Sequence, residues 1–246
     1  MPNFRLTLEY DGANFEGWQV QSGPHRTVQG ELGTAIARVT GQRVRTIGAS
    51  RTDAGVHAEG QVVSAVIATE LTPEVLQRAL NGTLPADAAV VEAERAPDDF
   101  HARYSARAKL YRYQVWNRPT RSPLRAARFL SVARRLDVAA MSKAAEAFVG
   151  RHDFAALQGA GSEVDSTVRT LARLQIEADP EGAIAFSVEG DSFLRHMVRN
   201  LVGTLLEVGS GRRPIESMAE LLAGGDRRRA GPTAPAHGLT LVRVLY

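Results

Sequence analysis

Residues 4–12, FRLTLEYDG, alternate apolar and polar side chains and end on an Asp-Gly pair. Phe4, Leu6, Leu8 and Tyr10 occupy every second position, which places them on one face of an extended chain. Asp followed by Gly is typical of a turn, because Gly accepts backbone angles that other residues avoid. The stretch therefore predicts a half-buried strand that runs into a turn.

Residues 28–40 have the spacing of a helix instead. Their apolar side chains recur every three or four positions, Thr27 is placed to cap the first turn, and Gly41 is placed to end the last. Strands and helices continue to alternate after this point. We expect further strands at 43–49, 61–67, 88–95, 109–116, 168–178, 183–189 and 239–245, and further helices from Thr72-Pro73 to near Gly82, at 137–149, from around Phe193 to Gly209, and from Pro214 toward Leu222.

The order of these elements gives two halves of similar build, joined near residues 100–108. We expect an α+β fold of two similar α/β domains, residues 1–105 and 106–246, with antiparallel or mixed sheets flanked by helices. Two such domains facing each other would leave a central cleft. Residues 159–162, Gly-Ala-Gly-Ser, are typical of a flexible loop.

The two halves differ in charge. Residues 1–105 contain nine Arg and thirteen Asp or Glu, a net charge of −4, whereas residues 106–246 contain 21 Lys or Arg and 14 Asp or Glu, a net charge of +7. Lysine occurs only at Lys109 and Lys143, so nearly all of the positive charge is guanidinium, which binds phosphate as a fork and stacks on bases. The second half is suited to nucleic acid, although genome base composition can also produce an Arg-rich chain, and charge alone leaves both explanations open.

Several kinds of chemistry lack their residues in this sequence. There is no cysteine, and hence no thiolate nucleophile, disulfide or Cys-ligated zinc. The six histidines form no HxxxH pair, and no GxxxxGK[ST] or GxGxxG motif occurs, so we expect neither a metal nor a nucleotide cofactor. No apolar run approaches 18 residues, and we expect a cytoplasmic protein that makes no use of a membrane.

The most unusual segment is residues 49–57, ASRTDAGVH, which places Arg51, Asp53 and His57 between two expected strands. Functional residues are often carried by such loops. A cation two positions from Asp53 can keep its carboxylate ionised and in one orientation, as a nucleophile or a general base requires. The same residues also suit an ordinary Asp turn and a structural ion pair, and spacing alone does not distinguish these alternatives.

Aromatic and basic side chains alternate farther along the chain. They are Tyr104, Tyr111, Tyr113 and Trp116, interleaved with Arg103, Arg107, Lys109 and Arg112. Stacking faces next to cations suit an unpaired base and its phosphates. Tyr111 and Tyr113 lie on one face of the expected strand, however, so at least one of them is expected in the core.

Two further groups of arginines could contact an anion. Arg195 and Arg199 are four residues apart at the start of the expected apolar helix, which would place them on one face beside the apolar stripe. An arginine there needs an anion, either a protein carboxylate or a substrate phosphate. The run at residues 226–229, Asp-Arg-Arg-Arg, is most simply a solvated loop, with phosphate contact as the alternative.

Seven blocks of the sequence together resemble one family. They are EYDGANFEGWQVQ, TVQGEL, SRTDAGVHAEGQV, DDFHARYSARAKLYRY, GRHDFAAL, FLRHMVRNLVGTLLEVGSG and APAHGLTLVRVLY. They run nearly from end to end in the family's order, and in them the chain is similar to the tRNA pseudouridine synthase A family. Ser50 departs from the pattern, since many bacterial members have Gly there. Unlike Gly, Ser requires backbone angles at this position that a residue with a Cβ atom can adopt.

The resemblance implies an isomerase that converts uridine to pseudouridine at positions 38, 39 and 40 in the anticodon stem-loop of tRNA, without a cofactor. It also implies the pseudouridine synthase fold with a positively charged central cleft, and a homodimer. By resemblance Asp53 is the catalytic nucleophile, and Arg51 is the arginine next to it. Tyr111 corresponds to the tyrosine that stacks on the target base, and Arg199 to the helix arginine that pairs with the aspartate.

Two other functions are compatible with the sequence. The first is an RNA-binding protein that has the same fold but no catalytic activity; the presence of Arg51, Asp53, Tyr111 and Arg199 together argues against it. The second is a carboxylate-based hydrolase of nucleosides or sugars that uses Asp53 with His57. It lacks an obvious second carboxylate, because the Asp pair at 98–99 follows Pro97 in what should be a turn.

Overall fold

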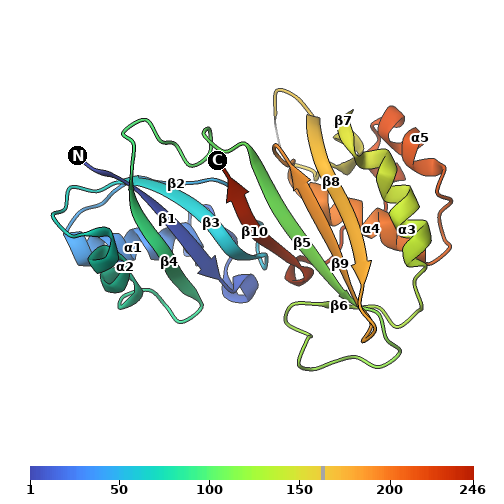
Figure 1. The fold of residues 1–246 in the computed structure, drawn as a ribbon, viewed down its shortest axis with the longest axis horizontal. Coiled ribbons are helices and arrows are strands. Elements are labelled where there is room, and N and C mark those ends of the chain that lie inside the picture. Colours follow the sequence, from blue (N-terminus) through green and yellow to red (C-terminus); the bar gives the residue numbers. More distant parts are fainter. Residues whose placement is uncertain (162–163) are drawn as a thin grey trace. The chain divides into compact units, whose positions relative to one another are not determined.

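The alternation at residues 4–10 forms strand β1 (Asn3–Tyr10) in the computed structural model, which describes residues 1–161 and 164–246. The described chain divides into two units, Met1–Arg107 with Thr240–Tyr246, and Ala108–Leu239. Each unit combines a sheet with helices, so the expected α+β class is confirmed (Figure 1). The last residue of the loop expected at 159–162 lies outside the described residues.

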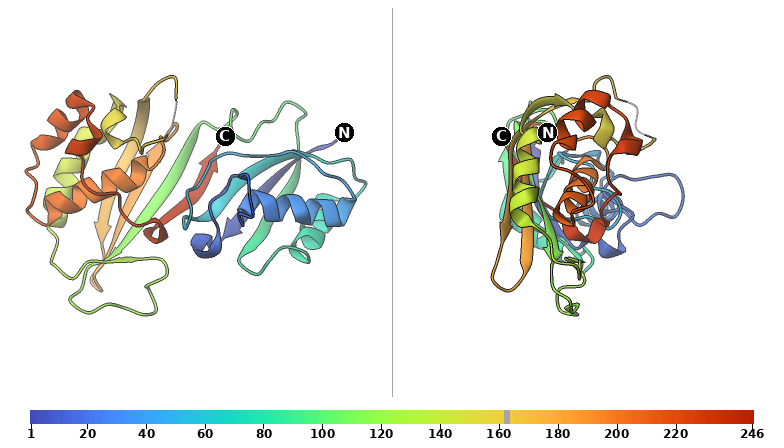
Figure 2. Two further views of the ribbon diagram at one scale, coloured as in Figure 1. Left: turned by 180° about the vertical axis from the view of Figure 1, so that it is seen from behind. Right: turned by 90° about the vertical axis from the view of Figure 1, so that its right-hand side faces the viewer.

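The first unit is a sheet with strand order β4-β1-β3-β10, with β2 also paired to β3. Strand β1 is antiparallel to β3 and β4, and β10 is parallel to β3. The helices lie on one face of this sheet (Figures 1 and 2). The remaining elements are α1 (Val28–Thr40), β2 (Thr46–Gly48), β3 (His57–Val66), α2 (Pro73–Asn81), β4 (Ala88–Ala96) and β10 (Leu239–Leu245).

The helix boundaries in this unit follow the sequence signals. The Thr27 side chain accepts a hydrogen bond from the Gly30 amide, and Gly41 ends α1 in the left-handed conformation with φ 72°. The Thr72 side chain caps α2 by accepting from the amide of Val75. Both predicted helices are therefore confirmed, and Val28, Leu32, Ala35 and Ile36 of the apolar face of α1 are buried.

The strands of the first unit depart from expectation in two places. The strand expected at 43–49 is reduced to Thr46–Gly48. Strand β3 starts earlier than expected, at His57, because partners extend it: Tyr10 of β1 pairs with Ala58, and β10 pairs with both His57 and Ala58. The sequence-based division grouped β10 with the second half, whereas most of it belongs to the first unit.

The second unit is an antiparallel sheet with strand order β5-β9-β8-β7, and β6 is added parallel to β5. Its helices lie on one face of the sheet (Figure 2). Strands β6 and β7 were not predicted, because strands this short are too brief to show an alternating pattern. The elements are β5 (Ala108–Trp116), β6 (Leu130–Ser131), α3 (Val138–Ala145), β7 (Gly150–Asp153), β8 (Val168–Ala178), β9 (Ala183–Gly190), α4 (Met197–Gly209) and α5 (Ser217–Gly224).

Helix α4 begins later than its apolar pattern suggested. His196 has φ 59°, a left-handed conformation that a helix does not continue through, and the helix starts at the next residue. Arg195 therefore lies outside the helix, and the expectation that it shares a helix face with Arg199 is wrong. The Arg195 guanidinium instead donates to the carbonyls of Ala160 and Gly161, at 2.9 and 3.2 Å.

Helix α4 is buried along most of its length and packs closely against a segment that follows α5. A Cβ atom at Gly203 would lie 1.7 Å from the carbonyl oxygen of Pro232. Glycine is thus the residue that allows residues 230–235, which we call the strap, to cross α4 in backbone contact.

We expect Gly203→Ala to lower the free energy of unfolding by about 1–3 kcal/mol, because the added methyl group must push the strap away from the helix. Urea unfolding followed by circular dichroism measures this loss.

Gly33 of α1 provides the matched control, since a Cβ there would meet nothing within 4 Å. Gly33→Ala should raise stability by about 0.5–1 kcal/mol, the ordinary gain for replacing Gly inside a helix. Equal effects of the two substitutions would contradict the contact between the strap and α4.

Candidate active site

The loop that carries Arg51 and Asp53 connects β2 to β3 in the first unit, and a buried glutamine holds its start. Gln61 of β3 is fully buried. Its Nε2 donates to the Ser50 carbonyl at 2.6 Å, and its Oε1 accepts from the Ser50 amide at 3.2 Å. One side chain thus satisfies both backbone groups of Ser50.

Serine at position 50 fits this geometry without strain. Among the described residues, His196 is the non-glycine residue with positive φ, so Ser50 lies outside the left-handed region that favours glycine. The departure from the family pattern at this position therefore requires no special conformation in this chain.

The middle of the loop packs on the segment that follows β1. The Thr52 carbonyl accepts from the Trp18 amide at 3.0 Å, and the Gly55 amide donates to the Phe15 carbonyl at 3.2 Å. The buried Thr52 hydroxyl lies 2.8 Å from the Tyr10 hydroxyl. Backbone bonds on both sides of Asp53 therefore fix the loop to the fold.

Arg51 and Asp53 flank the inward-pointing Thr52. Arg51 is exposed and Asp53 is half-buried. The Asp53 carbonyl accepts from the Val56 amide at 3.2 Å, with Gly55 at φ 78°, so the loop turns tightly directly after the aspartate. The turn interpretation is correct for the backbone here, and it leaves the carboxylate on a rigid support, as a nucleophile requires.

His57 has a structural position. It is fully buried, and its Nδ1 accepts a hydrogen bond from the Gly12 amide at 3.0 Å. Asp11 Oδ1 lies equally close to this nitrogen, at 3.0 Å. The amide can point only at a lone pair, so we assign Nδ1 as an acceptor without a hydrogen. This arrangement joins the turn after β1 to the start of β3 and gives no support to His57 as the partner of Asp53 in a hydrolase.

Tyr111 and Tyr113 both lie on β5 in the second unit, on its covered face. Tyr113 is fully buried and donates its hydroxyl to the Pro235 carbonyl at 2.9 Å. Burial raises the pKa of the Tyr113 hydroxyl, and the nearby charge of Arg199 acts in the opposite direction. Both tyrosines are buried, so the expectation that at least one of them lies in the core is confirmed. Tyr111 meets the ring of Phe193 edge-on, at 5.1 Å between centroids.

Arg199 lies near the start of α4 and is held by the strap. Its Nε donates to the Ala234 carbonyl at 2.8 Å, and the Ala234 amide donates back to the Arg199 carbonyl at 3.1 Å. Pro235, the next residue, receives the Tyr113 hydroxyl. The strap thus positions a cation and a core tyrosine side by side.

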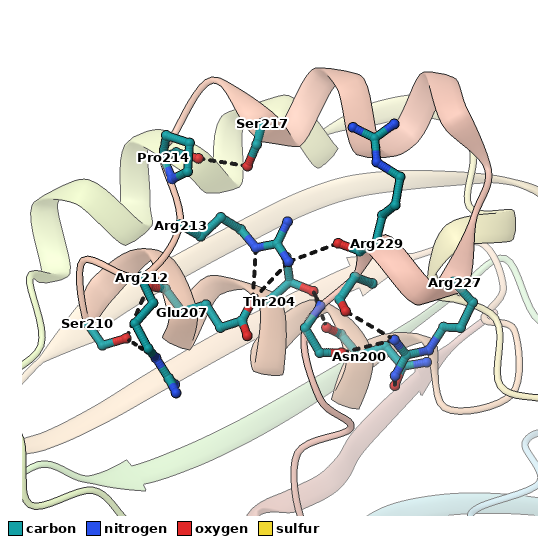
Figure 3. Close-up of polar contacts among 12 residues, drawn as sticks. Asn200, Thr204, Glu207, Ser210, Arg212, Arg213, Pro214, Ser217, Arg227 and Arg229 are labelled. Atoms are coloured by element: carbon teal, nitrogen blue, oxygen red, sulfur yellow. Dashed lines mark hydrogen bonds and ion pairs between the residues drawn. The ribbon is translucent and has the colours of Figure 1, made fainter.

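Arg227 fixes the strap to α4 (Figure 3). Its guanidinium donates to Asn200 Oδ1 at 3.0 Å, to Thr233 Oγ1 at 3.1 Å and to the Gly231 carbonyl at 3.0 Å. The Gly231 amide in turn donates to the buried Thr204 hydroxyl at 3.0 Å. Every one of these bonds joins the segment after α5 to the strap or to α4.

The interpretation of residues 226–229 as a solvated loop is therefore wrong for Arg227 and correct for Arg228. The Arg228 side chain is 90% exposed and pairs with Asp226 at 3.0 Å. Arg229 pairs with Glu220 at 3.3 Å and is half-exposed. The sequence alone could not show which of the three arginines is exposed, because this depends on the position of α4 relative to residues 227–229.

The expected site residues divide evenly between the units. Arg51 and Asp53 share one loop of the first unit, and Tyr111 and Arg199 lie on β5 and α4 of the second. In the described part of the chain no three His, Asp or Glu side chains are grouped so that they could hold a metal ion.

The family model described as tRNA pseudouridine synthase matches residues 7–105 and 144–246. The chain belongs to this family.

Curated relatives match this chain over its full length. The tRNA pseudouridine synthase A of Myxococcus xanthus is 49% identical over 247 residues, covering 100% of this chain and 92% of the relative. That of Ruminiclostridium cellulolyticum is 42% identical over 246 residues and is covered completely in both directions. The resemblance carried by the seven sequence blocks is therefore confirmed.

The structure shows supporting residues whose roles the sequence did not reveal. Gln61 and Asn200 were not singled out from the sequence, and Arg227 was expected in a solvated loop, although each supports the loop or the strap. A glutamine within an otherwise apolar strand and an asparagine within an apolar helical stripe are the signals that could have found the first two.

We expect Gln61→Leu to lower the free energy of unfolding by about 1–3 kcal/mol, because both Ser50 backbone groups lose their partner in a buried place. It should also slow the reaction, since the loop start is released. Urea unfolding and turnover measured on the same preparation check both effects.

Gln21→Leu is the control, because the exposed Gln21 makes one side-chain bond, to the Glu16 carbonyl. Its effect on stability should stay within about 0.5 kcal/mol. If Gln61→Leu were equally harmless, the loop would not depend on this anchor.

Proposed function

We propose that this protein isomerises uridine to pseudouridine in tRNA, at positions 38, 39 and 40 of the anticodon stem-loop. The observation that carries the proposal is a carboxylate, Asp53, on a loop bonded to the fold on both sides, in a chain that belongs to the tRNA pseudouridine synthase family. The relatives' name supports tRNA as the substrate.

The reaction explains why so few groups are needed. The bond from N1 of uracil to the sugar breaks, the base turns, and C5 joins the same sugar carbon while its proton is lost and N1 gains one. No atom is gained or lost overall, so a positioned carboxylate and a site that retains the detached uracil suffice, without a cofactor.

Each expected site residue has a role in this proposal. Asp53 attacks as the nucleophile or stabilises the cation that forms on the sugar. Arg51 and Arg199 keep it ionised. Tyr111 stacks on the uracil and assists removal of the C5 proton. The four residues are proposed to act on one uridine, with the first unit supplying the carboxylate.

The Arg-rich second half, net +7 over residues 106–246, is proposed to bind the phosphates of the RNA. A uridine within a duplex must be flipped out, which costs a few kcal/mol, and a basic surface with a stacking tyrosine can offset this cost. We also propose a cytoplasmic homodimer, on the basis of the family. None of the helices in the described ranges is long and apolar enough to cross a membrane.

We expect Asp53→Asn to reduce turnover at least about a thousandfold, because the amide cannot act as the nucleophile. The measurement is release of tritium from tRNA labelled at C5 of uridine, under conditions in which the variant still binds tRNA and is folded. Glu70→Gln, at an exposed position of the first unit, serves as the control and should retain full activity.

The alternatives give different results in the same assay. Wild-type protein that binds tRNA without releasing tritium would be an RNA-binding protein without catalytic activity. Release of free uracil would indicate a hydrolase. Full turnover by Asp53→Asn would contradict the assignment of the nucleophile.

A further inference from the structure

Tyr104 is exposed, unlike the other aromatic residues of its basic stretch. Tyr111 and Tyr113 are buried on β5, and the Trp116 indole donates to the Thr120 carbonyl at 3.1 Å. The Tyr104 side chain is 77% exposed. Such exposure is unusual for a large aromatic ring, and this side chain contributes little to the core of the unit.

The turn that presents Tyr104 is anchored in the first unit. Ala102 is fully buried, its amide donates to Ser64 Oγ at 3.1 Å, and its carbonyl accepts from the Tyr246 hydroxyl at 2.8 Å. The Ser105 amide closes the turn by donating to the His101 carbonyl at 2.9 Å. The tyrosine is exposed, but the backbone that carries it is fixed on both sides.

The ring of Tyr104 is already stacked on His101. The two ring centroids lie 4.3 Å apart, with 28° between the planes. His101 Nδ1 accepts from the amides of Arg103 and Tyr104, at 3.2 and 3.1 Å, which holds the imidazole in place beneath the tyrosine. The stack limits the freedom of the tyrosine before any ligand binds, and so reduces the entropy lost on binding.

The exposed charges of residues 98–107 balance. The Arg103 guanidinium carbon lies 5.6 Å from the centre of the Tyr104 ring. Arg107 adds a second exposed cation, while Asp98 and Asp99 are exposed on the same segment. This segment therefore has no net charge to attract RNA, and the exposed ring is the feature that could bind a base.

We propose that Tyr104, supported by His101, is a stacking platform for an unpaired base of the tRNA, distinct from the uridine that is modified. This inference rests on the proposed function, because it takes tRNA as the ligand. An exposed ring that is held by a histidine stack and has a guanidinium over it matches the way in which proteins hold single-stranded bases.

The first test compares binding of an anticodon stem-loop RNA by fluorescence anisotropy. Tyr104→Ala should weaken binding at least about fivefold, the lower part of the range for one stacked base. Tyr104→Phe retains the ring and should bind like wild type. Val91→Ala, which removes an exposed apolar side chain from β4, should have no effect.

Salt dependence separates stacking from charge. The ratio of affinities between wild type and Tyr104→Ala should stay constant as salt rises, whereas the absolute affinity of both proteins falls. His101→Ala should weaken binding less than Tyr104→Ala, because it removes the support but leaves the stacking ring.

The second test replaces each unpaired loop nucleotide in turn by an abasic residue. One position should cost wild type about the same factor as Tyr104→Ala, and cost Tyr104→Ala nothing further. Equal abasic effects in both proteins, or unchanged binding by Tyr104→Ala, would overturn the proposal. Tritium release by wild type is measured alongside, so failure of the proposed function would be recognised separately.

Discussion

The bond pair between the Gln61 side chain and the Ser50 backbone is the constraint on which the candidate site depends. A loop that packs between two strands removes backbone amides and carbonyls from water, and each of these groups then needs a hydrogen-bond partner. Gln61 supplies two partners at once, and the backbone bonds from Trp18 and to Phe15 fix the rest of the loop. The result is an aspartate whose backbone is fixed by hydrogen bonds on both sides.

The second unit uses the same physical device on a larger scale. Arg227 is bonded to Asn200, Thr233 and the Gly231 carbonyl, and these bonds hold the strap that receives the Arg199 guanidinium and the Tyr113 hydroxyl. A guanidinium has five donors in a fixed fork, so a single residue can join three segments. In both units, a polar side chain that bonds to distant backbone, Gln61 or Arg227, supports the segment nearest the proposed chemistry.

Much of the fold could be predicted because the signals are local. Thr27 and Gly41 cap the two ends of α1, and each cap involves only residues three or four positions apart. The start of α4 could not be predicted, because no local sequence signal indicates that His196 takes the left-handed conformation. The partner of β10 lies far away in sequence, and the roles of Gln61 and Arg227 depend on which distant backbone they meet. For the site, Arg51 and Asp53 stood out by spacing, whereas Tyr111 and Arg199 gained their roles from the family resemblance, and all four assignments remain predictions.

The most direct test of the central claim is to map pseudouridine in unmodified tRNA transcripts by carbodiimide primer extension, after incubation with wild type and with Asp53→Ala, without added cofactor. Stops at positions 38, 39 and 40 that disappear with the variant are the predicted result. Absence of stops with folded wild-type protein that binds the transcripts, or stops that persist with Asp53→Ala, would contradict the account.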